Sequence, residues 1–119
     1  MTRPKPLVPG RVRAVEHPFG WVPFRLLTSG ILKELSAEAS LLYFFLTLVA
    51  DPKGLSYWSD ERMEQQLGLP QGLLELARQE LLDRDLVAHG GMLYQVLSLP
   101  STPRASARTS PQTVDRTDA

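Results

Sequence analysis

An apolar run near the middle of the chain, Leu41 to Ala50, limits the possible folds more than any other segment; its only polar groups are the hydroxyls of Tyr43 and Thr47. Ser36 is a good N-cap ahead of this run, and Glu38 favours the first turn of a helix. A helix that is apolar on nearly all sides belongs at the centre of a core. The run has about half of the ~20 residues that a membrane-spanning helix needs. We therefore expect a soluble, cytoplasmic protein with no membrane partner.

Local signals after this helix predict a strand and a second helix. Asp51-Pro52-Lys53-Gly54 fits a type I turn, and Leu55 to Trp58 reads as a short strand. Ser59 is the N-cap of the second helix, because Asp60 and Glu61 follow it at the positive end of the helix dipole. Met63 and Leu67, four residues apart, face inward, and Gly68 ends the helix as a left-handed C-cap.

A third helix and a hairpin complete the body. The helix is predicted over Gln71 to Asp83, with a buried stripe formed by Leu73, Leu74, Ala77 and Leu81. Leu86 to His89 is the first strand of the hairpin, Gly90-Gly91 is the turn, and Met92 to Leu99 is the return strand.

This order of elements predicts the fold class. Two helices joined by a short turn that contains glycine form a helix-turn-helix. A hairpin after them, with the early strand available to extend it, forms a winged helix. We expect a mainly α fold with a small β-hairpin (α+β), built on a three-helix core and a two- or three-stranded wing sheet. A short helix, Phe24 to Leu27, is expected to open after Pro23, with Leu32 and Leu35 packing as a link.

Composition divides the chain into three parts. Residues 1–20 hold four prolines and most of the basic excess, so they are predicted to form an extended, flexible arm. Residues 21–99 form the winged-helix domain. Residues 100–119 are rich in Pro, Ser, Thr and Arg, and they are predicted to form a disordered tail because they have too little apolar surface to offset the entropy of ordering.

The net charge of zero conceals an uneven distribution. Residues 1–30 carry five basic side chains and one acidic side chain, a net charge of +4. Residues 31–99 carry five basic and ten acidic side chains, a net charge of −5, and residues 100–119 carry three and two, a net charge of +1. A basic arm on an acidic body indicates contact between the arm and nucleic acid or another acidic surface.

The composition also excludes several kinds of chemistry. The chain has no cysteine and only two histidines, His17 and His89, far apart in the sequence. We therefore predict no disulfide, no metal site and no cofactor. There is no glycine-rich phosphate loop, no Ser/His/Asp arrangement and no paired carboxylates in an evident cleft, since Asp83 and Asp85 read as a solvated helix end. We expect neither an enzyme nor a small-molecule substrate.

Several segments carry a resemblance to a known group of proteins. They are Pro23–Leu27, Leu35-Ser36, Leu42–Leu46 and Gly54–Arg62, followed by Leu67-Gly68-Leu69, Ala77–Leu81 and Asp85–Ala88. Together they resemble the amino-terminal winged-helix domains of plasmid and phage replication initiators, and the chain is also similar to small helix-turn-helix proteins of bacterial mobile elements. The resemblance covers about residues 21–99. It implies binding of double-stranded DNA through the third helix and the wing, in replication initiation or transcriptional control.

The residues predicted to contact DNA follow from this expectation. The exposed face of the third helix is predicted to consist of Gln71, Gly72, Glu75, Arg78 and Gln79. Gln pairs with adenine, Arg with guanine, and Glu accepts from cytosine. The wing has no Lys or Arg, so phosphate binding is assigned to the arm. The remaining predicted contacts are Arg3, Lys5, Arg11 and Arg13 in the arm, Arg62 on the second helix and His89 beside the wing tip.

An alternative function belongs to a different class. The acidic body, the uncharged wing and two tryptophans expected to be exposed, Trp21 and Trp58, are typical of a protein-interaction module. Such a module would form a homodimer or dock on a larger replication or partition protein without binding DNA itself. A stable dimer without DNA affinity distinguishes it from the first hypothesis.

Overall fold

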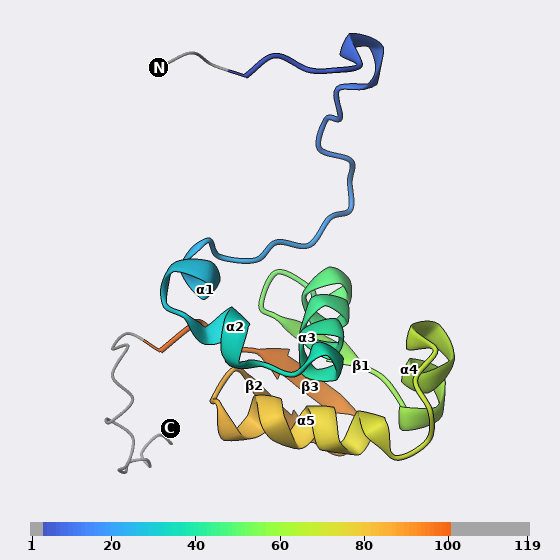
Figure 1. Cartoon of the computed structure of the whole chain (residues 1–119). Helices are drawn as coiled ribbons and strands as arrows, with labels where there is room; N and C mark the ends of the chain where they lie inside the picture. The colour runs from blue at the N-terminus through green and yellow to red at the C-terminus, as the bar shows by residue number, and fades with distance from the viewer. Residues whose placement is uncertain (1–3, 101–119) are drawn as a thin grey trace.

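A computed structural model describes residues 4–100 of the 119-residue chain (Figure 1). Its elements, in chain order, are a 3-10 turn at Pro9–Arg11, α1 at Arg25–Thr28, α2 at Ile31–Glu34, α3 at Ala37–Val49, β1 at Leu55–Tyr57, α4 at Asp60–Leu67, α5 at Leu73–Asp83, β2 at Val87–Gly90 and β3 at Leu93–Val96. The link expected at Leu32 and Leu35 contains the short helix α2.

The three strands form one antiparallel sheet in the order β1-β3-β2. β3 is central: Tyr94 lies opposite Ser56 on one neighbour and opposite His89 on the other. The early strand therefore extends the hairpin, as predicted. With three larger helices and this small sheet, the structure confirms a mainly helical α+β fold in a winged-helix-like arrangement.

The core lies where α3 crosses α5 in front of the sheet. Leu74, Ala77 and Leu81 repeat at spacings of three and four on α5, so they form one buried stripe, while the predicted Leu73 is half-buried at its edge. The helix α5 packs on α3, and the buried Leu42 and Leu46 of α3 belong to the same core as this stripe. Other fully buried members of the core are Ala39, Met63, Leu86 and Tyr94.

The helix ends confirm the predicted caps. The Ser36 hydroxyl accepts from the amide of Ala39, and the Ser59 hydroxyl accepts from the amide of Arg62. Gly68 ends α4 with a left-handed φ of 67°. A tertiary contact reinforces the first cap, because the Glu80 carboxylate of α5 accepts from the Ser36 amide (2.7 Å) and hydroxyl (2.8 Å). The start of α3 is thereby tied to α5.

The hairpin turn lies one residue later than predicted. Gly90 pairs with Leu93, so the two turn residues are Gly91 and Met92, not Gly90 and Gly91. Gly91 has a φ of 62°, and Met92 has no positive φ. A turn with positive φ only at its first central residue needs glycine there and accepts a side chain at the next position. The wing tip therefore exposes Met92.

The central helix is not buried on all sides, which corrects the expectation from its apolar composition. Leu41, Phe44 and Leu48 are 36–56% exposed, and they lie on the side of α3 that faces away from the core. The other elements of this small domain cover α3 on one side only, so its opposite side stays exposed. The apolar composition of the helix does not show which side that is.

The segments that flank the body correspond to the predicted arm and tail. Residues 4–19 are exposed along their whole length, and Pro9–Arg11 is the only regular element among them. Residues 1–3, which include Arg3, and residues 101–119 of the predicted tail lie outside the described residues. Within residues 4–100, no helix has both the length and the apolar character that crossing a membrane requires.

Candidate nucleic-acid interface

The exposed side of α5 is acidic and apolar. Glu75, Leu76, Gln79 and Asp83 are exposed on it, with Leu76 at 68%. The Gln79 side-chain amide donates to the Asp83 carboxylate at 2.8 Å. Gln71 is exposed in the turn ahead of the helix, and Gly72, with a φ of 95°, is its N-cap. Gln71 and Gly72 therefore precede α5, whereas the sequence placed them in its first turn.

Arg78 does not belong to this exposed side. Its guanidinium is bound to both carboxylate oxygens of Asp60, at 2.8 and 3.3 Å, and it donates to the Tyr94 hydroxyl at 2.8 Å. The Arg78 side chain is only 12% exposed. Burial lowers the pKa of Arg78, but the hydrogen bonds with Asp60 and Tyr94 outweigh this effect and raise it, so the group remains charged. The prediction that Arg78 is free to reach a base is wrong.

The reason lies in the geometry of the helix. Arg78 follows Leu74 by one turn, so it lies at the edge of the buried stripe, where it meets the start of α4. Asp60 at that start provides the carboxylate, and Tyr94 approaches from the sheet. The result is a network that joins α4, α5 and β3. Bidentate pairing of this kind is a strong, geometrically specific interaction.

Arg62 remains at the surface of α4. Its guanidinium lies 4.9 Å from the centre of the Trp58 ring, which is a cation–π contact. Trp58 in turn packs edge-on against Phe45, with ring centres 4.9 Å apart. Trp58 is therefore half-buried against the core, which corrects the expectation that it is an exposed interaction residue, whereas Trp21 is 72% exposed as expected.

The wing offers little for phosphate binding. His89 is half-buried and stacks on Tyr94 at 4.3 Å between ring centres. No Lys or Arg occurs between Leu86 and Pro100. The contact of His89 with DNA stays a prediction, and Tyr94 already covers one face of the His89 ring.

The basic arm and the exposed side of α5 lie apart. Lys5, Arg11 and Arg13 are exposed, and the arm leaves the body beside α1, at the opposite side from α5 (Figure 1). Gly20 follows Lys5 by fifteen residues, so the chain between them spans up to about 50 Å when extended. A body of about 80 residues has a radius of gyration of about 12 Å. The arm is thus long enough to reach DNA held at α5.

The exposed stripe on α3 is a surface that sequence reasoning missed. Leu41, Phe44 and Leu48 repeat at spacings of three and four, and Ala37 continues the pattern by one more turn. The 4-3-4 spacing is visible in the sequence. The exposed stripe could not be distinguished in the sequence, because the residues between its members are equally apolar and form the core side of the same helix.

No group of three or more potential metal ligands occurs among residues 4–100. The chain matches no family model, no curated protein and no solved structure.

Proposed function

We propose that this protein binds double-stranded DNA as a winged helix, in replication initiation or transcriptional control on a mobile element. The observation that carries the proposal is the placement of α5. It is packed on α3 along one side and exposed along the other, and it follows α4 through a short glycine-bounded turn. In helix-turn-helix proteins the second helix of such a pair lies in the major groove with its amino-terminal residues at the base edges.

Base contacts are assigned to Gln71, Glu75 and Gln79, since Arg78 is engaged with Asp60. Gln71 lies just ahead of α5 and Glu75 lies in its first turn, at the end of the helix that reaches deepest into a groove. A glutamine amide pairs with adenine in two bonds, and a carboxylate accepts from the cytosine amino group. Gln79 can hydrogen-bond to a base only if its side-chain amide gives up the hydrogen bond to the Asp83 carboxylate.

Phosphate binding is assigned to the arm and to Arg62. The exposed side of α5 has two carboxylates and the wing has no cation, so neither attracts a polyanion. Lys5, Arg11 and Arg13 are exposed, and Arg62 is the exposed cation of α4. Together with Arg3, outside the described residues, they form five cationic contacts. Phosphate neutralisation supplies most of the non-specific affinity for DNA.

Selection of the full-length protein against a random duplex pool tests this function. We expect an enriched motif of a few base pairs, and loss of that motif when Gln71 and Glu75 are replaced by alanine. Glu64→Ala is the matched control, because it removes a carboxylate from the half-buried side of α4. If micromolar protein binds no duplex at low salt, DNA binding is rejected.

A second candidate function is protein interaction, and the exposed stripe of α3 favours it. An apolar stripe at strict 4-3-4 spacing is the seam that a helix presents to another helix. In an antiparallel pair of two copies, Leu41 would lie opposite Phe44, and the small Ala37 opposite Leu48. Such a two-fold contact is self-complementary. It is compatible with DNA binding, because α5 is on a different side of the body.

Light scattering over a range of protein concentrations tests the dimer. We expect the mass of a dimer for the wild type and the mass of a monomer for Leu48→Glu, because a charge buried in an apolar seam is strongly disfavoured. Leu76→Glu is the control, since Leu76 is a comparably exposed leucine on α5. A monomeric wild type, or equal effects of both substitutions, would exclude this seam.

A further inference from the structure

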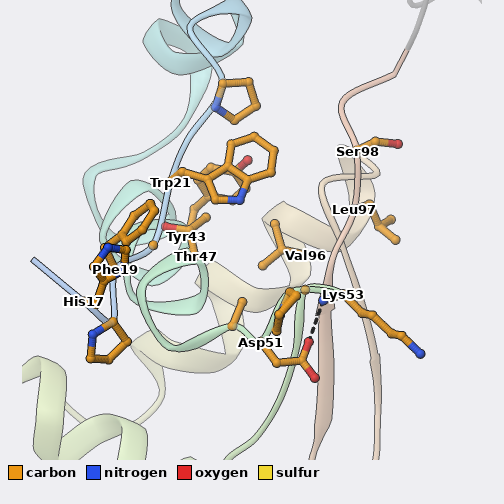
Figure 2. Close-up of a pocket in the computed structure, with 16 residues that line it drawn as sticks. His17, Phe19, Trp21, Tyr43, Thr47, Asp51, Lys53, Val96, Leu97 and Ser98 are labelled. Carbon is orange, nitrogen blue, oxygen red and sulfur yellow. Dashed lines mark hydrogen bonds between the residues drawn. The ribbon is translucent and has the colours of Figure 1, made fainter. Parts of the chain in front are cut away.

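A cavity of about 660 Å³ lies where the root of the arm crosses the end of α3 (Figure 2). Phe19 and Trp21 form one wall, and Tyr43 and Thr47 approach from α3 beside them. The opposite wall consists of the turn 51–54 and of residues 96–98, at the end of β3 and after it. Binding sites for small molecules have volumes of about 300–1,000 Å³ and walls of this mainly apolar kind.

The wall at the turn 51–54 is held by hydrogen bonds, and the arm root lies close against α3. A Cβ at Gly20 would lie 2.3 Å from the carbonyl oxygen of Thr47, so the arm contacts the end of α3 at a distance that only glycine permits. Across the cavity, the Gly54 carbonyl accepts from the Val96 amide at 2.8 Å. The Asp51 carboxylate accepts from two amides of its own turn, those of Lys53 and Leu55. The wall at the turn 51–54 is therefore preformed.

Tyr43 provides the feature that points to a ligand. It is 3% exposed, and its hydroxyl makes no hydrogen bond to any group within residues 4–100. Tyr94, the other deeply buried tyrosine, differs in that its hydroxyl accepts from Arg78. Burial raises the pKa of Tyr43, so its hydroxyl stays protonated and is a hydrogen-bond donor. Buried hydroxyls without a partner are rare in folded proteins.

The charged groups at the rim restrict the kind of ligand. The Lys53 side chain extends away from the cavity (Figure 2), and the Asp51 carboxylate is engaged with its own turn. His17 packs edge-on against Phe19, with ring centres 5.2 Å apart. No described cation points into the space, so the site is unsuited to a phosphorylated ligand.

We propose that this cavity binds an uncharged planar aromatic molecule that stacks against Trp21 and accepts a hydrogen bond from Tyr43 through an oxygen atom. No residue proposed to contact DNA lines the site, so the test of this proposal does not depend on DNA binding. A ligand here would hold the arm root against α3 and β3. The competing occupant is a small cluster of water molecules, which a cavity of this size with a few polar groups also accommodates.

The test compares p-cresol with toluene, which lacks only the hydroxyl group. Each is titrated into the isotopically labelled full-length protein, and binding is followed by two-dimensional NMR at the amides of Gly20 and Gly54. We expect saturable shifts at both glycines and about fivefold tighter binding of p-cresol, because a net hydrogen bond contributes about that factor. Tyr43→Phe should remove the difference between the two probes and leave toluene binding unchanged.

Tyr94→Phe is the matched control, because it removes the same atom from the partnered tyrosine, outside the cavity. It should keep the preference for p-cresol. The proposal is overturned if neither probe saturates, if the shifts are spread over exposed apolar residues such as Phe44, or if Tyr43→Phe retains the preference. Both variants remove one hydroxyl and keep the ring, and thermal melting verifies that they fold.

Discussion

Replacing Arg3, Lys5, Arg11 and Arg13 by glutamine is expected to abolish most of the salt dependence of DNA binding. For the wild type, five phosphate contacts predict a slope of log K against log salt of about −4 to −5. With Arg62 as the remaining contact, the slope should be about −1. The physical reason is counterion release, which scales with the number of phosphates that the protein neutralises.

The structure makes this prediction specific to the arm. The exposed residues of α5 are Glu75, Leu76, Gln79 and Asp83. The three other arginines of the body are engaged within it: Arg78 pairs with Asp60, Arg84 pairs with Glu34, and Arg25 donates to the carbonyl oxygens of Leu99 and Pro100. No described cation on α5 or the wing compensates for the loss of the arm. Deletion of residues 2–14 should have the same effect as the four substitutions.

Fluorescence anisotropy with a labelled duplex at several salt concentrations measures the slope. Lys33→Gln is the control, because Lys33 is an exposed cation of α2 with no assigned contact to DNA. It should leave the slope unchanged. If the arm variants keep the wild-type slope, the phosphates are bound by another part of the chain and the assignment to the arm is wrong.

Gly54→Ala is expected to destabilise the fold by about 3 kcal/mol or more, since two penalties combine at this position. Gly54 has a φ of 87°, and a side chain in the left-handed region costs about 1–2 kcal/mol. In addition, the new Cβ would lie 2.5 Å from the carbonyl oxygen of Val96. That oxygen belongs to the backbone of β3, so relief of the clash requires the turn 51–54 to separate from the sheet.

Gly30→Ala isolates the first penalty. Gly30 has the same φ of 87°, but its nearest neighbour would be the flexible end of Lys33 at 3.8 Å, which is an ordinary contact. We expect a loss of only about 1–2 kcal/mol there. Urea unfolding followed by circular dichroism measures both variants. Equal losses would mean that the contact between Gly54 and Val96 does not constrain the sheet.

The order of the elements could be predicted because its signals are local. Ser36 and Ser59 cap helices through amides three residues away, and Gly68 ends α4 through its own backbone. The amide of Gly54 donates to the carbonyl of Asp51 within one four-residue turn. Interactions over so few residues depend on residue type and spacing alone. The winged-helix-like arrangement followed from their sequence.

The predictions of exposed residues on α5 were correct for some positions and wrong for others. The exposure of a residue on a helix depends on which other segments of the chain pack beside it. Glu75 and Gln79 are exposed as predicted, whereas Arg78, at the edge of the same face, is drawn into a network with Asp60 and Tyr94, 18 and 16 residues away in the chain. Periodicity identifies the middle of a buried stripe well. It does not determine which partner meets a residue at the stripe's edge.

Residue types and their spacing were sufficient to predict the three longer helices, the strands, the caps and the uneven distribution of charge, since each depends on neighbouring residues. Three features became clear only from the folded chain: which side of α3 is covered, which arginines are paired, and that Gly20 meets Thr47 beside the buried Tyr43. These features arise where segments distant in the chain meet. Residue type and spacing carry no information on such a contact until the fold brings the two segments together.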